Sequence, residues 1–283
     1  MRTGILVKII ALIISLFILT SCSKTRIFYN YSDWLILKWF DTYFDLTDPQ
    51  RSDLKKRIAR LLDWHRKSEL TKIAEHLKQL KSRYQKGLKG KDIDWIRTEH
   101  KQFWSRIIDH VKPDLITFLS TIEEDQVQQM ERELIDKNDW LVKQSKMTTE
   151  EAHASILKWF FELLEKWLGD LEPNQKQKIS NWVKADPRWI VIKLKNRQKF
   201  QTDFAQILRS KENLKENLQI WLHEPETYWT EDFKNRLEYK KQEWKEIILK
   251  IDEITLPHQR QHVANELKNY INDFLTLSHQ TPS

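Results

Sequence analysis

The histidines come closest, among the residues of this chain, to a pattern that could do chemistry. His258 and His262 lie four residues apart, so they share one face of any helix that carries both, and such a pair can bind a metal ion when further ligands lie nearby. Glu266 continues that face, but about 12 Å of helix rise separates it from His258. These three side chains cannot converge on one ion, and we expect a solvated helix face and no metal site.

Two other histidines fall among apolar residues spaced three and four apart. The simpler interpretation of His65 and His100 is a core histidine hydrogen-bonded to a carboxylate, with Asp41, Asp45 or Asp63 as the partner; the alternative is a pH sensor. The sequence contains no Gly-x-Ser-x-Gly turn, no glycine-rich phosphate loop and no His-Glu-x-x-His. We therefore expect no enzyme and no cofactor.

The single cysteine, Cys22, ends an N-terminal pattern of a different kind. A short basic stretch precedes the apolar run Ile9–Leu19, which is shorter than the ~20 residues that span a membrane as a helix. The Leu-Thr-Ser-Cys that follows resembles a bacterial lipobox, which implies cleavage before Cys22 and attachment of lipid to it. Residues 1–21 are then a lipoprotein signal peptide, and residues 22–31 a short tether that keeps the folded body close to the bilayer.

The implied location limits which classes of partner we expect. Without the two basic residues of the leader, 46 Lys and Arg stand against 41 Asp and Glu, a net charge of +5. An exported protein does not meet DNA, so we expect no nucleic-acid partner; membrane lipid, through acylated Cys22, and a protein partner or client are expected instead. Ser23, which follows the cysteine, is typical of the periplasmic face of the outer membrane in an organism with two membranes.

Composition predicts an all-α protein. Only 4 of 283 residues are glycine, which leaves few places for turns with positive φ, and Leu, Lys, Glu and Gln are abundant. Apolar residues recur every three or four positions along most of the chain, as in amphipathic helices. One such stripe ends near Pro113, so a new helix is expected from about 114 to 143. The predicted architecture is an elongated helical bundle.

Residues 28–44 are dense in aromatic side chains. The simpler interpretation is a helix over about 32–43 that packs on the body. The alternative is an interfacial helix in contact with lipid.

The chain carries signs of an internal duplication. Ile36-Leu-Lys-Trp-Phe40 recurs unchanged as Ile156-Leu-Lys-Trp-Phe160. Glutamines near four helix starts follow a long–short–long spacing. This predicts two similar four-helix halves, over 32–147 and 148–278, followed by a frayed tail over 279–283; a chance identity in a chain rich in Trp and Lys is the alternative. The four glutamines are Gln50, Gln126, Gln175 and Gln259.

A clear helix start lies at Leu46-Thr47-Asp48-Pro49-Gln50. Thr47 fits the N-cap and Gln50 the N3 position of a capping box, and Thr148 and Glu151 repeat this pattern. The Leu-Thr-x-x-Gln element resembles the motif of the Spy/CpxP-like periplasmic helical proteins, which act as ATP-independent chaperones or envelope-stress modulators. Capping of the helix alone is the simpler interpretation of the same residues.

A longer resemblance runs from Tyr29 to Leu70. Tyr-Asn, Asp-Trp, Asp-Leu-Thr with Gln50, and Trp64-His65-Arg66 followed by Glu69-Leu70 resemble the opening of an uncharacterised proteobacterial lipoprotein family with a domain of unknown function. The resemblance implies a helical lipoprotein and no particular activity. The residues that we single out for binding a partner or for structure are Thr47, Gln50, Trp64, His65 and Arg66.

These observations favour a membrane-anchored envelope lipoprotein with a binding role. The 13 Trp and 12 Phe exceed what one core requires, and residues 51–101 carry 16 Lys and Arg against 7 Asp and Glu. A holdase-like activity toward unfolded envelope proteins is the most concrete form of this role. The alternative is a structural or scaffold partner of an envelope protein complex, and an enzyme is the least favoured.

Overall fold

Helices make up almost all of the described chain. A computed structural model describes residues 22–280, so the expected signal peptide and the end of the expected frayed tail lie outside the described residues. No strand occurs between residues 22 and 280, and the all-α prediction is confirmed. The helices are α2 (Cys22–Asn30), α3 (Ser32–Phe44), α4 (Asp48–Trp64), η2 (His65–Glu69), α5 (Leu70–Gln85), α6 (Gly90–Leu119), α7 (Glu124–Asp136), α8 (Asp139–Ser145), α9 (Thr149–Leu168), α10 (Pro173–Trp182), α11 (Pro187–Arg209), η3 (Lys211–Asn213), α12 (Leu214–His223), η4 (Pro225–Tyr228), α13 (Glu231–Glu253) and α14 (Pro257–Ser278).

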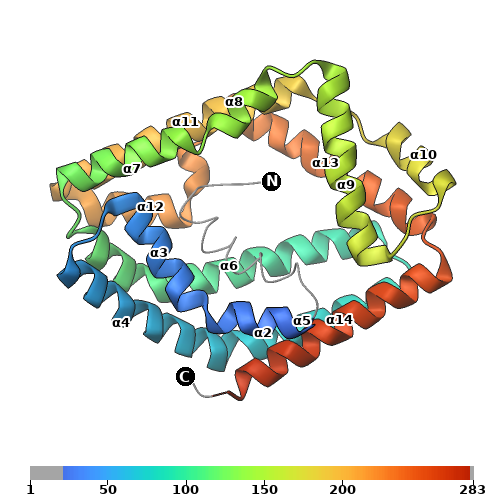
Figure 1. Cartoon of the computed structure of the whole chain (residues 1–283), viewed down its shortest axis with the longest axis horizontal. Helices are drawn as coiled ribbons and strands as arrows, with labels where there is room; N and C mark the ends of the chain where they lie inside the picture. The colour runs from blue at the N-terminus through green and yellow to red at the C-terminus, as the bar shows by residue number, and fades with distance from the viewer. Residues whose placement is uncertain (1–21, 281–283) are drawn as a thin grey trace.

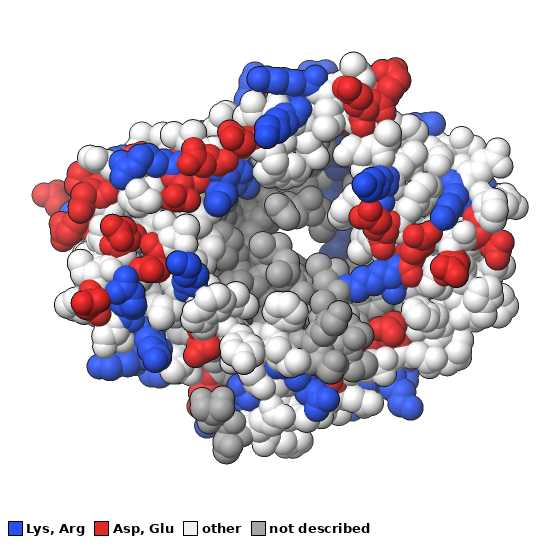
Figure 2. All heavy atoms as spheres, in the orientation of Figure 1, with Lys and Arg blue, Asp and Glu red and all other residues white. Residues whose placement is uncertain are grey.

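The helices of the described chain are arranged in a ring instead of stacking into one rod (Figure 1). α4, η2 and α5 form one side of this ring, with α14 packed along α5. α7 and α8 lie along α11 on the opposite side; α3 bridges α4 and α7, and α9 contacts α14. Figure 2 shows the same face with all heavy atoms, on which basic and acidic side chains are interspersed over the surrounding helices.

Apolar side chains gather in three cores. The largest joins α3, α4, α6, α7, α11 and α12 and buries Phe44, Phe118 and Trp221 almost completely. The second joins α5, α9, α10, α13 and α14 around Ile179. The third lies under α2, between α5 and α14. Both predicted halves contribute to the first two cores, and the boundary near residue 147 stays a prediction.

Both predicted capping boxes are present. The Thr47 hydroxyl accepts a hydrogen bond from the Gln50 N–H at 3.5 Å, and Gln50 Oε1 accepts one from the Thr47 N–H at 3.1 Å. At the start of α9, the corresponding distances between Thr148 and Glu151 are 3.2 Å and 2.9 Å. These bonds satisfy backbone donors that the first turn of a helix leaves free.

The expected helix break at Pro113 is wrong. α6 continues through the proline, although the missing N–H removes one bond of the helical ladder. Val111 and Leu115, on either side of the proline, are buried in the largest core, and their burial favours an uninterrupted helix. The helix predicted over 114–143 is instead the end of α6, then α7 and α8.

Residues 22–31, expected as a tether, form α2 and its junction with α3. Thr25, Tyr29 and Ser32 are buried at a spacing of three and four residues, and this stripe continues into α3. α2 packs against α14, so the segment belongs to the folded body. α3 confirms the helix expected over 32–43, and its Phe40 is buried in the largest core.

Candidate functional site

Gln50 and Gln126 join two helix starts at one corner of the ring. Gln50 Nε2 donates to Gln126 Oε1 at 2.9 Å, and Gln126 Nε2 donates back to Gln50 Oε1 at 2.8 Å. Each amide also donates to the backbone turn that precedes the other helix: Gln50 to the Thr121 carbonyl at 2.8 Å and Gln126 to the Phe44 carbonyl at 2.9 Å. The turn before α4 and the turn before α7 are thereby held together.

Gln175 and Gln259 make the same arrangement at a second corner. Their two amide–amide bonds are 2.8 Å and 3.0 Å long. Gln175 donates to the Ile254 carbonyl at 2.8 Å, and Gln259 donates to the Asp170 carbonyl at 2.7 Å. The repeat predicted from the spacing of the four glutamines therefore appears as two corners with the same hydrogen bonds.

The glutamine pairs have a structural role. Gln126, Gln175 and Gln259 are buried, and each amide oxygen also accepts a bond from the N-cap N–H of its own helix. A buried amide is costly unless its donors and acceptor are satisfied, and here they are satisfied within the fold. The Leu-Thr-x-x-Gln element thus does more than cap α4: Thr47 caps the helix, and Gln50 ties it to α7.

A π-turn interrupts the helix formed by α4 and α5, and it begins at the Trp64-His65-Arg66 motif. In η2 the Leu70 N–H bonds to the His65 carbonyl, five residues back. A π-turn inserts one extra residue into a helix, and such insertions occur frequently at functional sites. Here it turns both His65 and Glu69 into the protein, where they are 4% and 1% exposed.

His65 bonds to a tyrosine and not to a carboxylate. The Tyr29 hydroxyl lies 2.9 Å from His65 Nδ1, so the expected pairing with an aspartate is wrong. Burial lowers the pKa of His65 to about 4, although the nearby Glu69 carboxylate raises it in part. Burial also raises the pKa of Tyr29, which keeps the phenol protonated as the donor. At neutral pH His65 is an uncharged acceptor that fastens α2 to η2.

Glu69 is the charged centre of the same cluster. Arg106 from α6 lies 2.9 Å from its carboxylate and Lys72 lies 2.7 Å away. Burial opposes ionisation, but these two cations hold the pKa of Glu69 below its usual value. The Arg66 guanidinium lies 5.1 Å from the centre of the Tyr29 ring. We call Tyr29, His65, Arg66, Glu69 and Arg106 the α2 joint, because they connect α2 with η2 and α6.

Trp64 extends the contacts of the α2 joint on the side of α6. Its ring stacks on His110 with 3.9 Å between ring centres and an angle of 7° between the planes. All three residues of the Trp-His-Arg motif therefore contact other elements, whereas Thr47 and Gln50 lie at the separate Gln50–Gln126 corner.

The polar groups of the described chain do not form a metal centre. Residues 22–280 include no group of three or more His, Cys, Asp or Glu positioned to hold an ion. His258 and His262 are exposed on α14, and His100 is exposed on α6.

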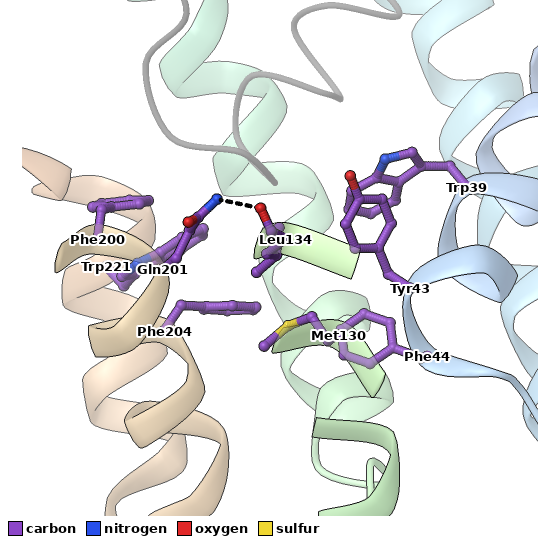
Figure 3. Close-up of a pocket in the computed structure, with 9 residues that line it drawn as sticks. All are labelled: Trp39, Tyr43, Phe44, Met130, Leu134, Phe200, Gln201, Phe204 and Trp221. Atoms are coloured by element: carbon purple, nitrogen blue, oxygen red, sulfur yellow. Dashed lines mark hydrogen bonds between the residues drawn. The ribbon is translucent and has the colours of Figure 1, made fainter. Parts of the chain in front are cut away.

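A pocket in the largest core is lined by aromatic and aliphatic side chains (Figure 3). The volume that the centre of a water molecule can occupy in it is about 10 Å³, close to the minimum for a single water. Gln201 is its amide side chain and donates to the Leu134 carbonyl at 3.5 Å. A space of this size does not admit a substrate. The lining residues are Trp39, Tyr43, Phe44, Met130, Leu134, Phe200, Gln201, Phe204 and Trp221.

Large apolar side chains lie on the surface at several places. Trp140 on α8, Trp159 on α9 and Tyr239 on α13 are 37%, 56% and 56% exposed. Other large exposed apolar side chains lie close together along α2 and the start of α3. Within residues 22–280 no helix is long and apolar enough to cross a bilayer.

These features define an all-helical protein in which glutamine pairs close two corners of a ring and a buried polar joint fixes the first helix. The chain belongs to a family of unknown function, DUF6279, and the match to this family spans residues 42–234. An uncharacterised domain, as the sequence resemblance implies, is thus confirmed. No curated protein and no solved structure matches the chain.

The sequence identified only part of these clusters. It singled out His65, Arg66 and Gln50, but neither Arg106 nor the pairing of the glutamines. The similar offsets of 125 residues between Gln50 and Gln175, and of 133 between Gln126 and Gln259, were the signal for two equivalent corners. Nothing in the sequence indicated that Arg106 lies in the α2 joint, because an arginine on a helix is ordinarily a surface residue.

Proposed function

We propose that this protein is a lipid-anchored envelope protein that binds other polypeptides on its surface, with holdase-like activity toward unfolded envelope proteins. The observation that carries the proposal is the placement of exposed aromatic rings beside cations. Lys193 lies 5.6 Å from the Trp140 ring, and Arg236 lies 4.6 Å from the Tyr239 ring. Such pairs suit an unfolded chain, which presents apolar and acidic groups together.

Binding is a better account of this surface than catalysis. The amides of the glutamine pairs satisfy one another, and the α2 joint is held by the Tyr29–His65 bond and the Glu69–Arg106 ion pair, which supports a structural role for both. The exposed rings are spread over α8, α9 and α13, which favours many weak contacts over one shaped site. We propose no enzymatic activity.

An aggregation assay tests the holdase. The purified protein should suppress aggregation of a chemically unfolded test protein at near-stoichiometric ratios. Replacing Trp159 and Tyr239 with serine should weaken suppression, whereas replacing the exposed Gln242 and Gln261 with serine should not. Raising the salt should also weaken it, because the Debye length falls from about 10 Å at 0.1 M to about 3 Å at 1 M.

The scaffold role is the second outcome of this test. No suppression at several-fold excess, together with one stable partner recovered by a pull-down with the intact lipidated protein, would reject the holdase in favour of a scaffold. The two cores to which both predicted halves contribute support the scaffold role, because they make the ring a rigid frame.

Anchoring is tested separately at Cys22. Cys22→Ser should abolish labelling with a radioactive fatty acid and block lipoprotein-type cleavage; normal labelling of this variant would reject the anchor. In an organism with two membranes, sucrose-gradient fractionation should place the wild type with the outer membrane, on its periplasmic face.

A further inference from the structure

Four large apolar side chains form an exposed stripe at the N-terminal end of the described chain. Ile27, Phe28, Tyr31 and Trp34 are 55%, 43%, 61% and 59% exposed. Positions 27, 31 and 34 repeat at four and three residues, so they lie along one face of α2 and the start of α3. We call these four residues the N-terminal stripe. Four of the eleven exposed large apolar side chains of the described chain fall within these eight residues.

The opposite face of the same segment is locked to the body. Tyr29 bonds to His65 of η2, and Arg26 lies 3.2 Å from the buried Asp273 of α14. Burying the N-terminal stripe would require α2 to roll over. That movement would break the Tyr29–His65 bond and leave the Asp273 carboxylate without its cation, so the fold holds the stripe outward.

We infer that the N-terminal stripe lies in the headgroup region of a phospholipid bilayer and sets how the ring sits on the membrane. The inference rests on the proposed lipid anchor at Cys22, because α2 begins at that residue. At 1.5 Å per residue, Trp34 lies about 18 Å along the helical path from Cys22. An acyl chain on Cys22 would therefore hold the stripe beside the bilayer.

The composition of the stripe matches an interface and not a hydrocarbon core. Trp and Tyr favour the boundary between water and lipid, where an apolar ring and a polar tip are both satisfied. The exposed Lys38 continues the face beyond Trp34. Asp33 is the exposed acidic group next to the stripe, so we expect shallow contact with headgroups and no deeper insertion.

The test uses the lipidated protein in vesicles of phosphatidylethanolamine and phosphatidylglycerol. Cys22 is the only cysteine, so acylation leaves an introduced cysteine as the single free thiol. Tyr31→Cys and Trp34→Cys, labelled with an environment-sensitive fluorophore, should show blue-shifted emission and quenching by nitroxide lipids. Tyr239→Cys and Trp159→Cys are matched controls, because these aromatic residues are similarly exposed on other helices.

Quenching several-fold stronger at positions 31 and 34 than at 159 and 239 supports the inference. Equal quenching at all four positions, or none at 31 and 34, overturns it if the protein still floats with the vesicles, and the anchor then stands. A protein that does not float and whose Cys22 reacts with a maleimide overturns the anchor and the inference together.

Discussion

We expect His65→Gln to remove a large part of the acid sensitivity of the fold. The amide oxygen of glutamine can still accept the hydrogen bond of Tyr29, but the side chain does not titrate. In the wild type, burial lowers the pKa of His65 from 6.5 to about 4. At about 1.4 kcal/mol per pKa unit, this difference corresponds to about 3 kcal/mol of unfolding free energy.

Because the pKa of His65 is lowered in the folded state, the unfolding free energy falls as the pH falls. The folded state prefers neutral His65, so its contribution is fully present above pH 6.5, where the unfolded histidine is also neutral. It is lost as the pH falls from 6.5 toward about 4, because the unfolded chain then binds a proton that the folded chain does not. Between pH 7 and pH 5 the wild type should lose about 2 kcal/mol through this group.

Urea unfolding followed by circular dichroism measures this between pH 7 and pH 5. The fold lowers the pKa of carboxylates such as Glu69 and Asp186 below their usual range, which itself lies below pH 5. The stability that these carboxylates contribute is therefore lost mainly below this pH window. His262→Gln, at an exposed position, is the control and should follow the wild type. If the His65→Gln and wild-type curves run parallel over this range, burial of His65 does not couple folding to pH and the reasoning is refuted.

Three further predictions concern the helix starts and one turn, and each is checked by urea unfolding at pH 7. Thr47→Ala should cost about 0.5–2 kcal/mol as a lost N-cap, and an unchanged midpoint would contradict its capping role. Gln126→Leu should cost about 1–3 kcal/mol, because it leaves the amide of Gln50 without its partner, and the double variant with Gln50→Leu should cost less than the sum of the single variants; simple additivity would exclude coupling. Gly87→Ala should cost about 1–2 kcal/mol because residue 87 has φ +84°, whereas Gly90→Ala, which meets only the flexible end of Lys245, should cost less; equal costs would show that backbone strain is not the cause.

Local features of the sequence determined the helical class and the two capped helix starts. Thr47 with Gln50, and Thr148 with Glu151, act within one turn of helix, so neighbouring residues suffice to predict them. Pro113 shows where local rules fail. The cost of one missing hydrogen bond is a local matter, but the burial of Val111 and Leu115 that offsets it depends on helices far away in the sequence.

Only the tertiary structure decided which distant groups meet. Gln50 and Gln126 are 76 residues apart, and Tyr29 and His65 are 36 apart; no spacing rule joins them, because their contact depends on how the helices turn at the corners of the ring. Residue type also did not determine which aromatic side chains are exposed. Trp34 and Phe40 stand six residues apart in one aromatic segment, yet they are 59% and 3% exposed. Helical periodicity places them on different faces, and only the packed neighbours determine which face is covered.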